Sequence, residues 1–329
     1  MISPGIVSTQ GHDHQKQKMS TLTFSRDWLR HIASETVEIS IRGTYTNTKG
    51  EVILVRDALD YAMENSVHYH SCHDFKLENP KTKFDTQYRV CYGSSIELAT
   101  NLYREFNLDN THIGVLNSAS GKSPGGKFFR GTISQEDCIC RASLLYPCLL
   151  QYQDKVHHFY KVNSRPKYHS SNSSCAIFCP LVPIIRKDTM RGELLDHFLK
   201  VSFISIPAPN AFALGPRESV KSVPKPQSPG ANDRNEPYEY MSLEEAMFDR
   251  CFRALCILAE HKCTELVLCA FGCGVHGNNP EEIAKCFRGI LETNEFKGRF
   301  RTVVFAIQSS RHANYTAFEN VFCKDSMSR

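Results

Sequence analysis

Residues 111–120, THIGVLNSAS, form a continuous apolar run that ends in small polar residues. Three other segments have the same character: 200–210 (KVSFISIPAPN), 264–274 (TELVLCAFGCG) and 301–308 (RTVVFAIQ). Apolar runs without polar alternation are typical of strands that are buried on both faces of a sheet. Helical patterns lie between several of these runs, so the sequence predicts an α/β fold with a mixed or parallel sheet flanked by helices.

Capping signals mark where the predicted helices begin and end. Ser94, Ser242 and Asn279 each stand immediately before a helical pattern, where a short polar side chain can accept a hydrogen bond from the first helical N–H groups. Another amphipathic helix is predicted from Arg26, with Gly43 at its end. We therefore expect an N-terminal helical extension ahead of the sheet.

The domain organisation predicted from the sequence is one domain with two irregular segments. Residues 1–22 have the polar composition of a disordered leader, and residues 23–329 hold all the predicted strands and helices. Within them, residues 214–240 are rich in Pro, Ser, Gly, Asn and charge, which is typical of a flexible insertion loop. A domain boundary is the alternative, but the strands after this segment resemble those before it.

Composition argues against several classes of function. Hydrophobic residues make up 41% of the 329 residues, and no apolar run is long enough to span a bilayer. The N-terminus lacks the apolar segment of a secretory signal, so we expect an intracellular protein of the nucleus, the cytoplasm or both. A net charge of +4 without a basic stripe favours neither a membrane partner nor direct sequence-specific nucleic-acid binding. The 14 cysteines include no CxxC pair and are expected to be reduced and mostly buried.

Two glycine-rich loops follow predicted strands and precede predicted helices. The first contains Gly125 and Gly126 followed by Lys127, and the second is the segment 271–280, FGCGVHGNNP. At such positions backbone N–H groups and the helix dipole favour anions, so each loop is a candidate phosphate cradle. An ordinary turn is the alternative for either loop taken alone.

A pair of carboxylates, Glu136 and Asp137, stands at the start of an apolar periodic run. One interpretation is a capping box, with Ser134 as N-cap and Asp137 as the third helical residue, together contributing about 1–2 kcal/mol. The other interpretation is catalysis, since a partly buried carboxyl can hold a proton near neutral pH and protonate a leaving oxygen.

The spacing of these features resembles a family signature. Gly125-Gly126-Lys127, seven further residues and then Gln135-Glu136-Asp137 resemble the pattern Gly-Gly-Gly, six to eight residues, Gln-Glu-Glu of the microbial (bacterial and fungal) poly(ADP-ribose) glycohydrolases, a divergent branch of the macrodomains. The resemblance covers about residues 25–323. Further segments occur in the family's order: RDWLRHIASETVEISIRGTY, VLNSAS, CRASLLYPCL, SIPAPN and FGCGVHGNNP.

The resemblance implies a macrodomain-like mixed sheet and a hydrolase. The family cleaves ribose–ribose O-glycosidic bonds, so poly(ADP-ribose) and ADP-ribosylated proteins are the implied substrates and ADP-ribose the implied product. No metal or other cofactor is implied, and we expect a monomer. The alternative function is a module that binds ADP-ribose or poly(ADP-ribose) with weak or lost catalysis.

The resemblance also implies roles for individual residues. Asp137 falls on the catalytic position, where the family has a glutamate that protonates the leaving ribose oxygen and then activates water. Glu136 and Gln135 stand beside it and, with Asn117, orient the distal ribose. The two diphosphate loops correspond to Pro124, Gly125, Gly126 and Lys127 and to Gly272, Cys273, Gly274 and Val275.

Two further positions have a plain alternative. His276 stands where the family often has an aromatic residue that packs on the distal ribose, but it could also be an ordinary polar loop residue. Phe318 lies on a C-terminal helix that closes the adenine side in this family, but a phenylalanine facing the core is the plainer interpretation.

Departures from the family pattern concern the catalytic and the first glycine positions. Asp137 is one methylene shorter than the family's glutamate, and a displacement of about 1 Å can cost on the order of 10²-fold in rate. Lys127 replaces the third glycine, which excludes easy positive φ there but adds positive charge.

Histidines outside these motifs are weak candidates for metal ligands. His12 and His14 are better explained as part of a disordered polar tail. Residues 68–74, HYHSCHD, fit no standard zinc spacing, so a solvated loop is the favoured interpretation.

Overall fold

The computed structural model describes residues 25–80, 83–106, 113–155, 157–169, 171–214, 222–225, 240–308 and 310–323. The predicted leader, with His12 and His14, lies outside these ranges, as does most of the predicted insertion at 214–240. Within that insertion, β8 (Ser222–Pro224) pairs with β9 (Tyr240–Ser242), which begins at its last residue. The predictions of one domain, a leader and a flexible insertion stay predictions.

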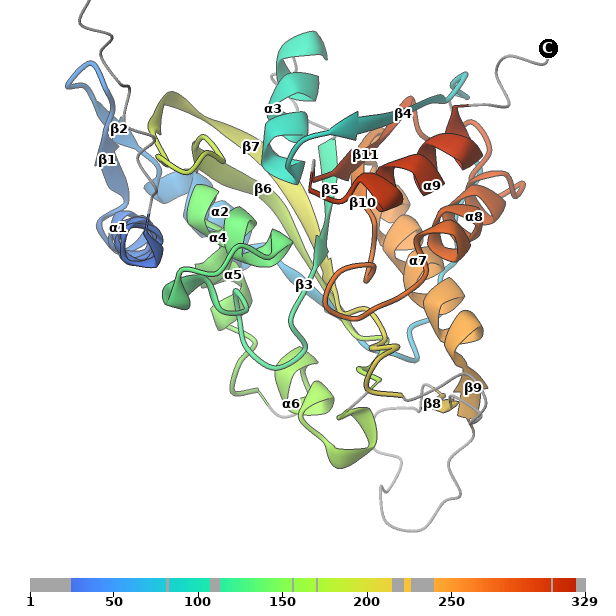
Figure 1. Cartoon of the computed structure of the whole chain (residues 1–329). Helices are drawn as coiled ribbons and strands as arrows, with labels where there is room; N and C mark the ends of the chain where they lie inside the picture. Colours follow the sequence, from blue (N-terminus) through green and yellow to red (C-terminus); the bar gives the residue numbers. More distant parts are fainter. Residues whose placement is uncertain are drawn as a thin grey trace, which may run out of the picture.

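A seven-stranded mixed sheet forms the centre of the described structure (Figure 1). The strands β7, β5, β10, β11 and β4 run parallel in that order, and β6 pairs antiparallel with β7 on one side and with β3 on the other. The bounds, in sheet order, are β3 Val67–Tyr69, β6 Ala176–Arg186, β7 Leu194–Ile206, β5 Ile113–Ser118, β10 Glu265–Cys269, β11 Thr302–Ile307 and β4 Gln87–Tyr92.

Helices cover both faces of this sheet, which explains why the central strands have apolar residues without alternation. Every residue of β10 and β11 is buried, as are the first five residues of β5. Successive side chains of β5 enter different cores: Val115 packs with the N-terminal helices and Leu116 with the C-terminal helices. The prediction of an α/β fold with a buried mixed sheet is confirmed.

The two helical layers are built from different halves of the chain (Figure 1). One core contains side chains of α1 Arg26–Arg42, α2 Arg56–Glu64, α3 Ser95–Phe106, α4 Gln135–Ala142, α5 Leu145–Leu150 and α6 Phe159–Asn163. The other contains side chains of α7 Leu243–Glu260, α8 Pro280–Leu291 and α9 His312–Phe322.

The predicted helix ends are correct. Gly43 ends α1 with a φ of 75°, in the left-handed region that glycine adopts most easily. Ser242 forms a complete capping box at the start of α7, Asn279 accepts a hydrogen bond from the N–H of Glu281 at the start of α8, and Ser94 accepts one from the N–H of Glu97.

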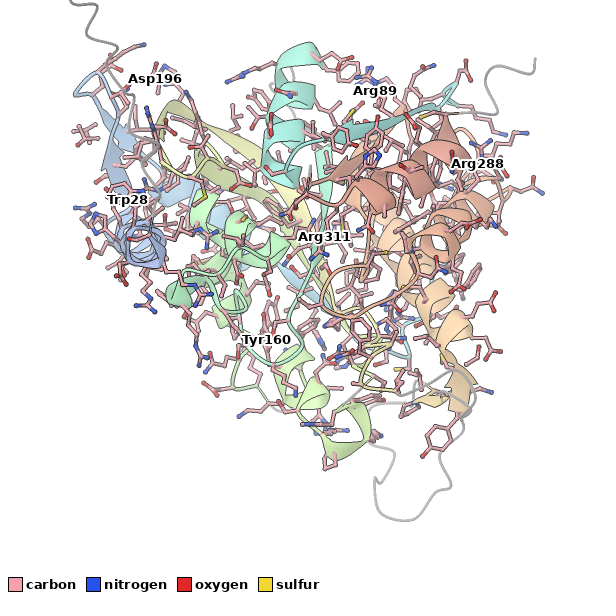
Figure 2. The ribbon with its side chains drawn as sticks, in the orientation of Figure 1. Trp28, Arg89, Tyr160, Asp196, Arg288 and Arg311 are labelled. Atoms are coloured by element: carbon pink, nitrogen blue, oxygen red, sulfur yellow. The ribbon has the colours of Figure 1, made fainter. Side chains whose placement is uncertain are left out.

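The N-terminal extension consists of α1 and a hairpin, β1 (Thr44–Thr46) with β2 (Val52–Leu54), beside β7. Lys49, in the hairpin turn, forms an ion pair of 3.0 Å with Asp196 of β7. Figure 2 labels Asp196 beside the hairpin. In α1, the Glu35 carboxylate lies 2.7 Å from the buried Arg186 guanidinium of β6. These contacts attach the extension to the antiparallel side of the sheet.

The segment 68–74 differs in part from the predicted solvated loop. His68 belongs to strand β3, because the chain here completes the edge of the sheet against β6. Its ring stacks on that of His158 at 4.8 Å and lies 4.5 Å from that of His70. Burial lowers the pKa of His68 to about 3, so its ring is neutral at physiological pH.

The cysteines agree with the expectation of reduced thiols. All 14 are free and nine of them are buried. No helix in the described ranges is long and apolar enough to cross a membrane.

Candidate active site

The two glycine-rich loops leave the same edge of the sheet. The first joins β5 to α4, and the second joins β10 to α8. Because β5 and β10 are parallel neighbours, their carboxyl ends point the same way, and the loops lie side by side there (Figure 1).

Asp137 caps α4 and also holds the first glycine loop. Its Oδ2 accepts a hydrogen bond from the N–H of Ser134 at 2.9 Å, and the Ser134 hydroxyl accepts one from the N–H of Asp137 at 3.4 Å. Its Oδ1 accepts a hydrogen bond from the N–H of Lys127 at 2.8 Å. The capping box expected from the sequence is therefore present, and the side chain is only 1% exposed.

Glu136 occupies a different environment from its neighbour. Its Oε2 accepts a hydrogen bond from the N–H of Ser120 at 2.7 Å, and its Oε1 lies 3.5 Å from Nδ2 of Asn117. Burial raises the pKa of the Glu136 carboxyl to about 8; the Ser120 N–H and the Asn117 amide oppose this rise, and the charge of Asp137 adds to it. Glu136 therefore holds a proton at neutral pH without an ion-pair partner among the described residues.

Asn117, at the end of β5, carries an unsatisfied acceptor. Its Nδ2 donates to the hydroxyl of Ser205 on β7 at 3.0 Å. Its Oδ1 is buried and has no hydrogen-bond partner within the described structure. A buried acceptor left without a donor costs about 1–3 kcal/mol, so this oxygen is a place where a ligand hydroxyl would gain a bond.

Gln135 connects α4 with the strands beneath it. Its Nε2 donates to Oγ of Ser95 at 2.7 Å and to the carbonyl of Leu116 at 2.9 Å, and its Oε1 accepts from the N–H of Ser118 at 2.9 Å. Both amide hydrogens are thus bound within the protein. In this arrangement Gln135 fixes the position of α4, and it has no free donor for the ribose contact that the resemblance implied.

The first glycine loop lies directly over both carboxylates. Gly126 has a φ of 61°, and a methyl group on it would lie 2.9 Å from Oε2 of Glu136 and 3.1 Å from Oδ1 of Asp137. Lys127 has a φ of −122°, so replacing the family's third glycine by lysine introduces no backbone strain. The loop thus needs its glycines for close approach, and Lys127 supplies an N–H that binds Asp137.

Replacing Gly126 by alanine should lower the free energy of unfolding by about 1–2 kcal/mol, because the left-handed backbone is strained for alanine and its methyl group meets both carboxylates. Denaturation in urea measures the change. Gly289→Ala on α8 is the matched control, since a methyl group there contacts nothing within 4 Å. That control should leave stability unchanged or raise it by up to about 1 kcal/mol. Equal effects of the two variants would contradict the close approach at Gly126.

The second loop combines a tight turn with an exposed tip. Gly272 has a φ of 70°, and a methyl group on it would lie 2.5 Å from Nδ2 of Asn278. Cys273 is buried, whereas Gly274 faces open space and Val275 is 79% exposed. His276 is half-buried, and burial lowers its pKa, so the ring is neutral at physiological pH.

Phe318 belongs to the core and not to the surface of either loop. It is fully buried, with its ring centroid 5.0 Å from that of Phe305 and 6.4 Å from that of Phe322. The structure places this side chain between α9 and β11, which agrees with the plainer interpretation of a phenylalanine facing the core.

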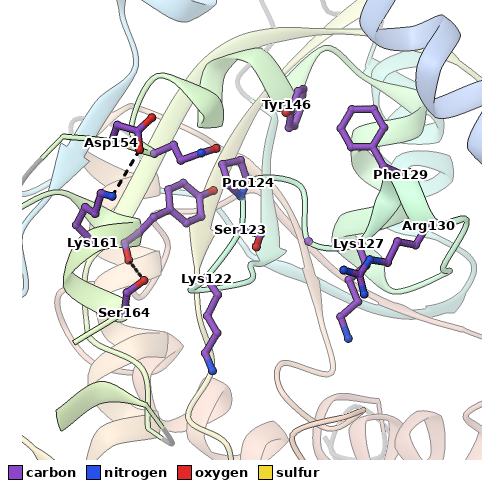
Figure 3. Close-up of a pocket in the computed structure, with 13 residues that line it drawn as sticks. Lys122, Ser123, Pro124, Lys127, Phe129, Arg130, Tyr146, Asp154, Lys161 and Ser164 are labelled. Atoms are coloured by element: carbon purple, nitrogen blue, oxygen red, sulfur yellow. Dashed lines mark hydrogen bonds and ion pairs between the residues drawn. The ribbon is translucent and has the colours of Figure 1, made fainter. Parts of the chain in front are cut away.

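A cavity of about 420 Å³ lies between the first loop and helices α5 and α6 (Figure 3). Pro124, Gly126 and Lys127 of the predicted site line it. Several other lining residues were not predicted from the sequence. They are Lys122, Phe129 and Arg130 beside the glycines, Tyr146 on α5 and Tyr160 on α6. For the first three, the available signal was the mixture of cations and aromatic rings around the glycines in the segment 122–130 (KSPGGKFFR).

Across the described ranges, no group of three or more His, Cys, Asp or Glu side chains is arranged to hold a metal ion. The rings of His68 and His158 stack on each other in an aromatic contact.

Comparisons with known proteins agree with the geometry. The family model described as "Microbial-type PARG, catalytic domain" matches residues 33–187. The crystal structure of poly(ADP-ribose) glycohydrolase (PARG) from Thermomonospora curvata is 29% identical, covering 89% of this chain and 99% of that one, with a TM-score of 0.74. The same enzyme bound to the inhibitor ADP-HPD is 28% identical and covers 89% and 98%, with a TM-score of 0.71. The enzyme from Deinococcus radiodurans in complex with ADP-ribose is 27% identical and covers 82% and 98%, with a TM-score of 0.63. No curated protein sequence gives a significant match.

Proposed function

Since this chain belongs to the microbial-type poly(ADP-ribose) glycohydrolases, we propose that it hydrolyses ribose–ribose O-glycosidic bonds of poly(ADP-ribose), releases ADP-ribose, and does so through Glu136 and Asp137. The observation that carries the proposal is the place of a buried carboxyl, Glu136, directly beneath a glycine loop, where burial raises its pKa to about 8. Such a group can donate a proton to a leaving alkoxide, the difficult part of glycoside cleavage.

In the proposed reaction Glu136 acts first as acid and then as base. It donates its proton to the leaving ribose oxygen as the bond from that oxygen to the anomeric carbon breaks. The resulting carboxylate then takes a proton from the water that attacks the oxocarbenium-like carbon, which regenerates the acid. The unsatisfied Oδ1 of Asn117, beside Glu136, would accept a hydrogen bond from a hydroxyl of the distal ribose.

Asp137 has a different part in this proposal from the one that the resemblance implied. Both of its oxygens accept backbone N–H groups, so its carboxyl is fixed between the first loop and the start of α4. As a fixed negative charge it would stabilise positive charge on the ribose, keep the glycine loop in place and help to keep Glu136 protonated. The shorter aspartate side chain remains at the helix N-terminus, where a glutamate would extend further.

Substrate entry requires a movement of the first loop. Glu136 and Asp137 are 2% and 1% exposed, respectively, and the bonds from Ser120 and Lys127 hold the loop onto them. The glycines at 125 and 126 give this segment the backbone freedom to move.

An ADP-ribose-binding module with weak or lost catalysis is the second candidate function. The capping box formed by Asp137 favours this binding function, because the carboxyl at the family's catalytic position is then bound to the helix N-terminus and does not extend toward a ligand. Incubation with poly(ADP-ribose), followed by chromatography of the products, separates the two functions. Catalytic release of free ADP-ribose supports the enzyme, and stoichiometric binding without release supports the module.

ADP-ribose itself should bind and raise the melting temperature, because both glycine loops keep their geometry. At a concentration of one hundred times Kd, the stabilisation should be about 2.7 kcal/mol. Differential scanning fluorimetry and calorimetric titration measure the two effects, with free ribose as the control ligand. A flat titration at millimolar ADP-ribose would exclude this site.

A further inference from the structure

The cavity beside the first loop carries an excess of positive charge. Lys122, Lys127 and Arg130 line it with exposed side chains, and within the described part of the chain none of the three forms an ion pair. The cavity's lining also includes Lys161 and one carboxylate, Asp154, which lie 3.5 Å apart (Figure 3). Cations without carboxylate partners around one cavity favour a ligand with phosphate groups.

Aromatic side chains line the same cavity. Phe129 is 45% exposed, and its ring lies edge-on to that of Tyr146 at a centroid distance of 5.3 Å. Tyr160, from α6, also lines the cavity, and its hydroxyl is buried without a hydrogen-bond partner in the described structure. Rings on which a base can stack, next to cations that bind phosphate, are the combination that recognises a nucleotide.

The cavity shares the first glycine loop with the proposed reaction centre, although neither Glu136 nor Asp137 lines it. Gly126 lines it and lies against both carboxylates, and Lys127 lines it while its N–H binds Asp137. Among the described residues, none of 271–277 contributes to the lining. A nucleotide here would therefore contact the first loop without contacting the second, outside a diphosphate site formed by both loops.

From this arrangement we infer that the cavity binds the ADP-ribose unit on the leaving side of the scissile bond. This inference rests on the proposed function and adds a second nucleotide subsite to it. It follows that a fragment of two linked ADP-ribose units binds more tightly than ADP-ribose alone, and that the difference depends on Lys122, Arg130 and Phe129.

Affinity measurements with a non-hydrolysing protein test the subsite independently of turnover. In a Glu136→Gln background, the two-unit fragment should bind about tenfold more tightly than ADP-ribose, equivalent to one or two good phosphate or stacking contacts. Adding Lys122→Glu and Arg130→Glu, or Phe129→Ala, should bring this ratio close to one and leave the Kd for ADP-ribose unchanged. Lys297→Glu, an exposed lysine outside the cavity, should leave both affinities unchanged.

The outcomes separate the subsite from the proposed function. An unchanged ratio in the charge-reversal and Phe129 variants would overturn the subsite, and so would an equal loss of affinity for both ligands. If the wild-type protein releases no ADP-ribose but the affinity ratio still falls as expected, the glycohydrolase activity is wrong and the subsite stands as part of a binding module.

Discussion

Replacing Glu136 by glutamine should lower the turnover of poly(ADP-ribose) by about 10²–10⁴-fold, the range that a positioned general acid contributes, with little change in the Kd for ADP-ribose. An amide of the same shape cannot deliver a proton to the leaving oxygen. The fold should tolerate it, because Oε1 of glutamine can accept from the N–H of Ser120, and Nε2 can donate to the unsatisfied Oδ1 of Asn117 once that amide turns. Single-turnover assays with labelled polymer give the rate, and thermal denaturation checks folding.

The same residue sets an expected pH dependence. Activity needs the protonated form, so kcat/KM should be level below the pKa of Glu136, about 8, and fall as the pH rises through it. Stability follows the same direction. The folded-state pKa is raised above the ordinary 4.5, so this contribution to stability is fully present below pH 4.5 and is lost as the pH rises through about 8. The alkaline limb of activity should vanish in Glu136→Gln, and wild-type turnover by that variant would end the assignment.

Replacing Asp137 by asparagine should lower the free energy of unfolding by about 1–3 kcal/mol, the cost of leaving a buried donor unsatisfied. The carboxylate accepts two backbone N–H groups, from Lys127 and Ser134, and an amide can accept only one of them with its single oxygen. Urea denaturation measures this loss. Asp27→Asn is a matched control, since Asp27 is an exposed first-turn acid of α1 and should change stability by less than about 0.5 kcal/mol.

Kinetics of the Asp137→Asn variant distinguish the two assignments of the acid. With Glu136 as acid, removing the neighbouring negative charge lowers the pKa of Glu136, so the alkaline limb should move to lower pH while turnover remains measurable. With Asp137 as acid, turnover should disappear, and the Glu136→Gln variant should keep its alkaline limb. Asp137→Glu adds a third comparison, because a higher rate in that variant would support a catalytic role at this position.

The sequence indicated most of the sheet, because strands covered on both faces must be apolar throughout. It did not indicate β6, whose segment AIFCPLVPIIR contains two prolines that argue against a strand. The fold accommodates them where the register with β7 shifts between Cys179 and Val182, with Leu181 at a φ of 50°. Neither the edge position of β3 nor its pairing with β6 leaves a local signal in residues 67–69.

At the site, local patterns identified the glycine loops, the cap and the pair of carboxylates. They could not decide which carboxyl holds a proton, because the pKa of Glu136 is raised by burial under a loop that begins sixteen residues earlier, at Ser120. The partners of Gln135 likewise come from α3 and β5. The cavity beside α6 depends on the packing of three separate segments, so no single motif could reveal it.

The order of strands in the sheet has a consequence for how the chain acquires activity during synthesis. The segment that matches the family model, 33–187, contains β5 and both carboxylates, but the strands on either side of β5 are β7 and β10, which follow it in the chain. Strand β4 can pair only later still, because its partner β11 ends at Ile307. A nascent chain released at residue 187 would therefore expose unpaired strand edges and would not form the site. The two carboxylates to which we assign the chemistry are translated early, and they reach their positions in the fold only after the C-terminal strands have emerged from the ribosome.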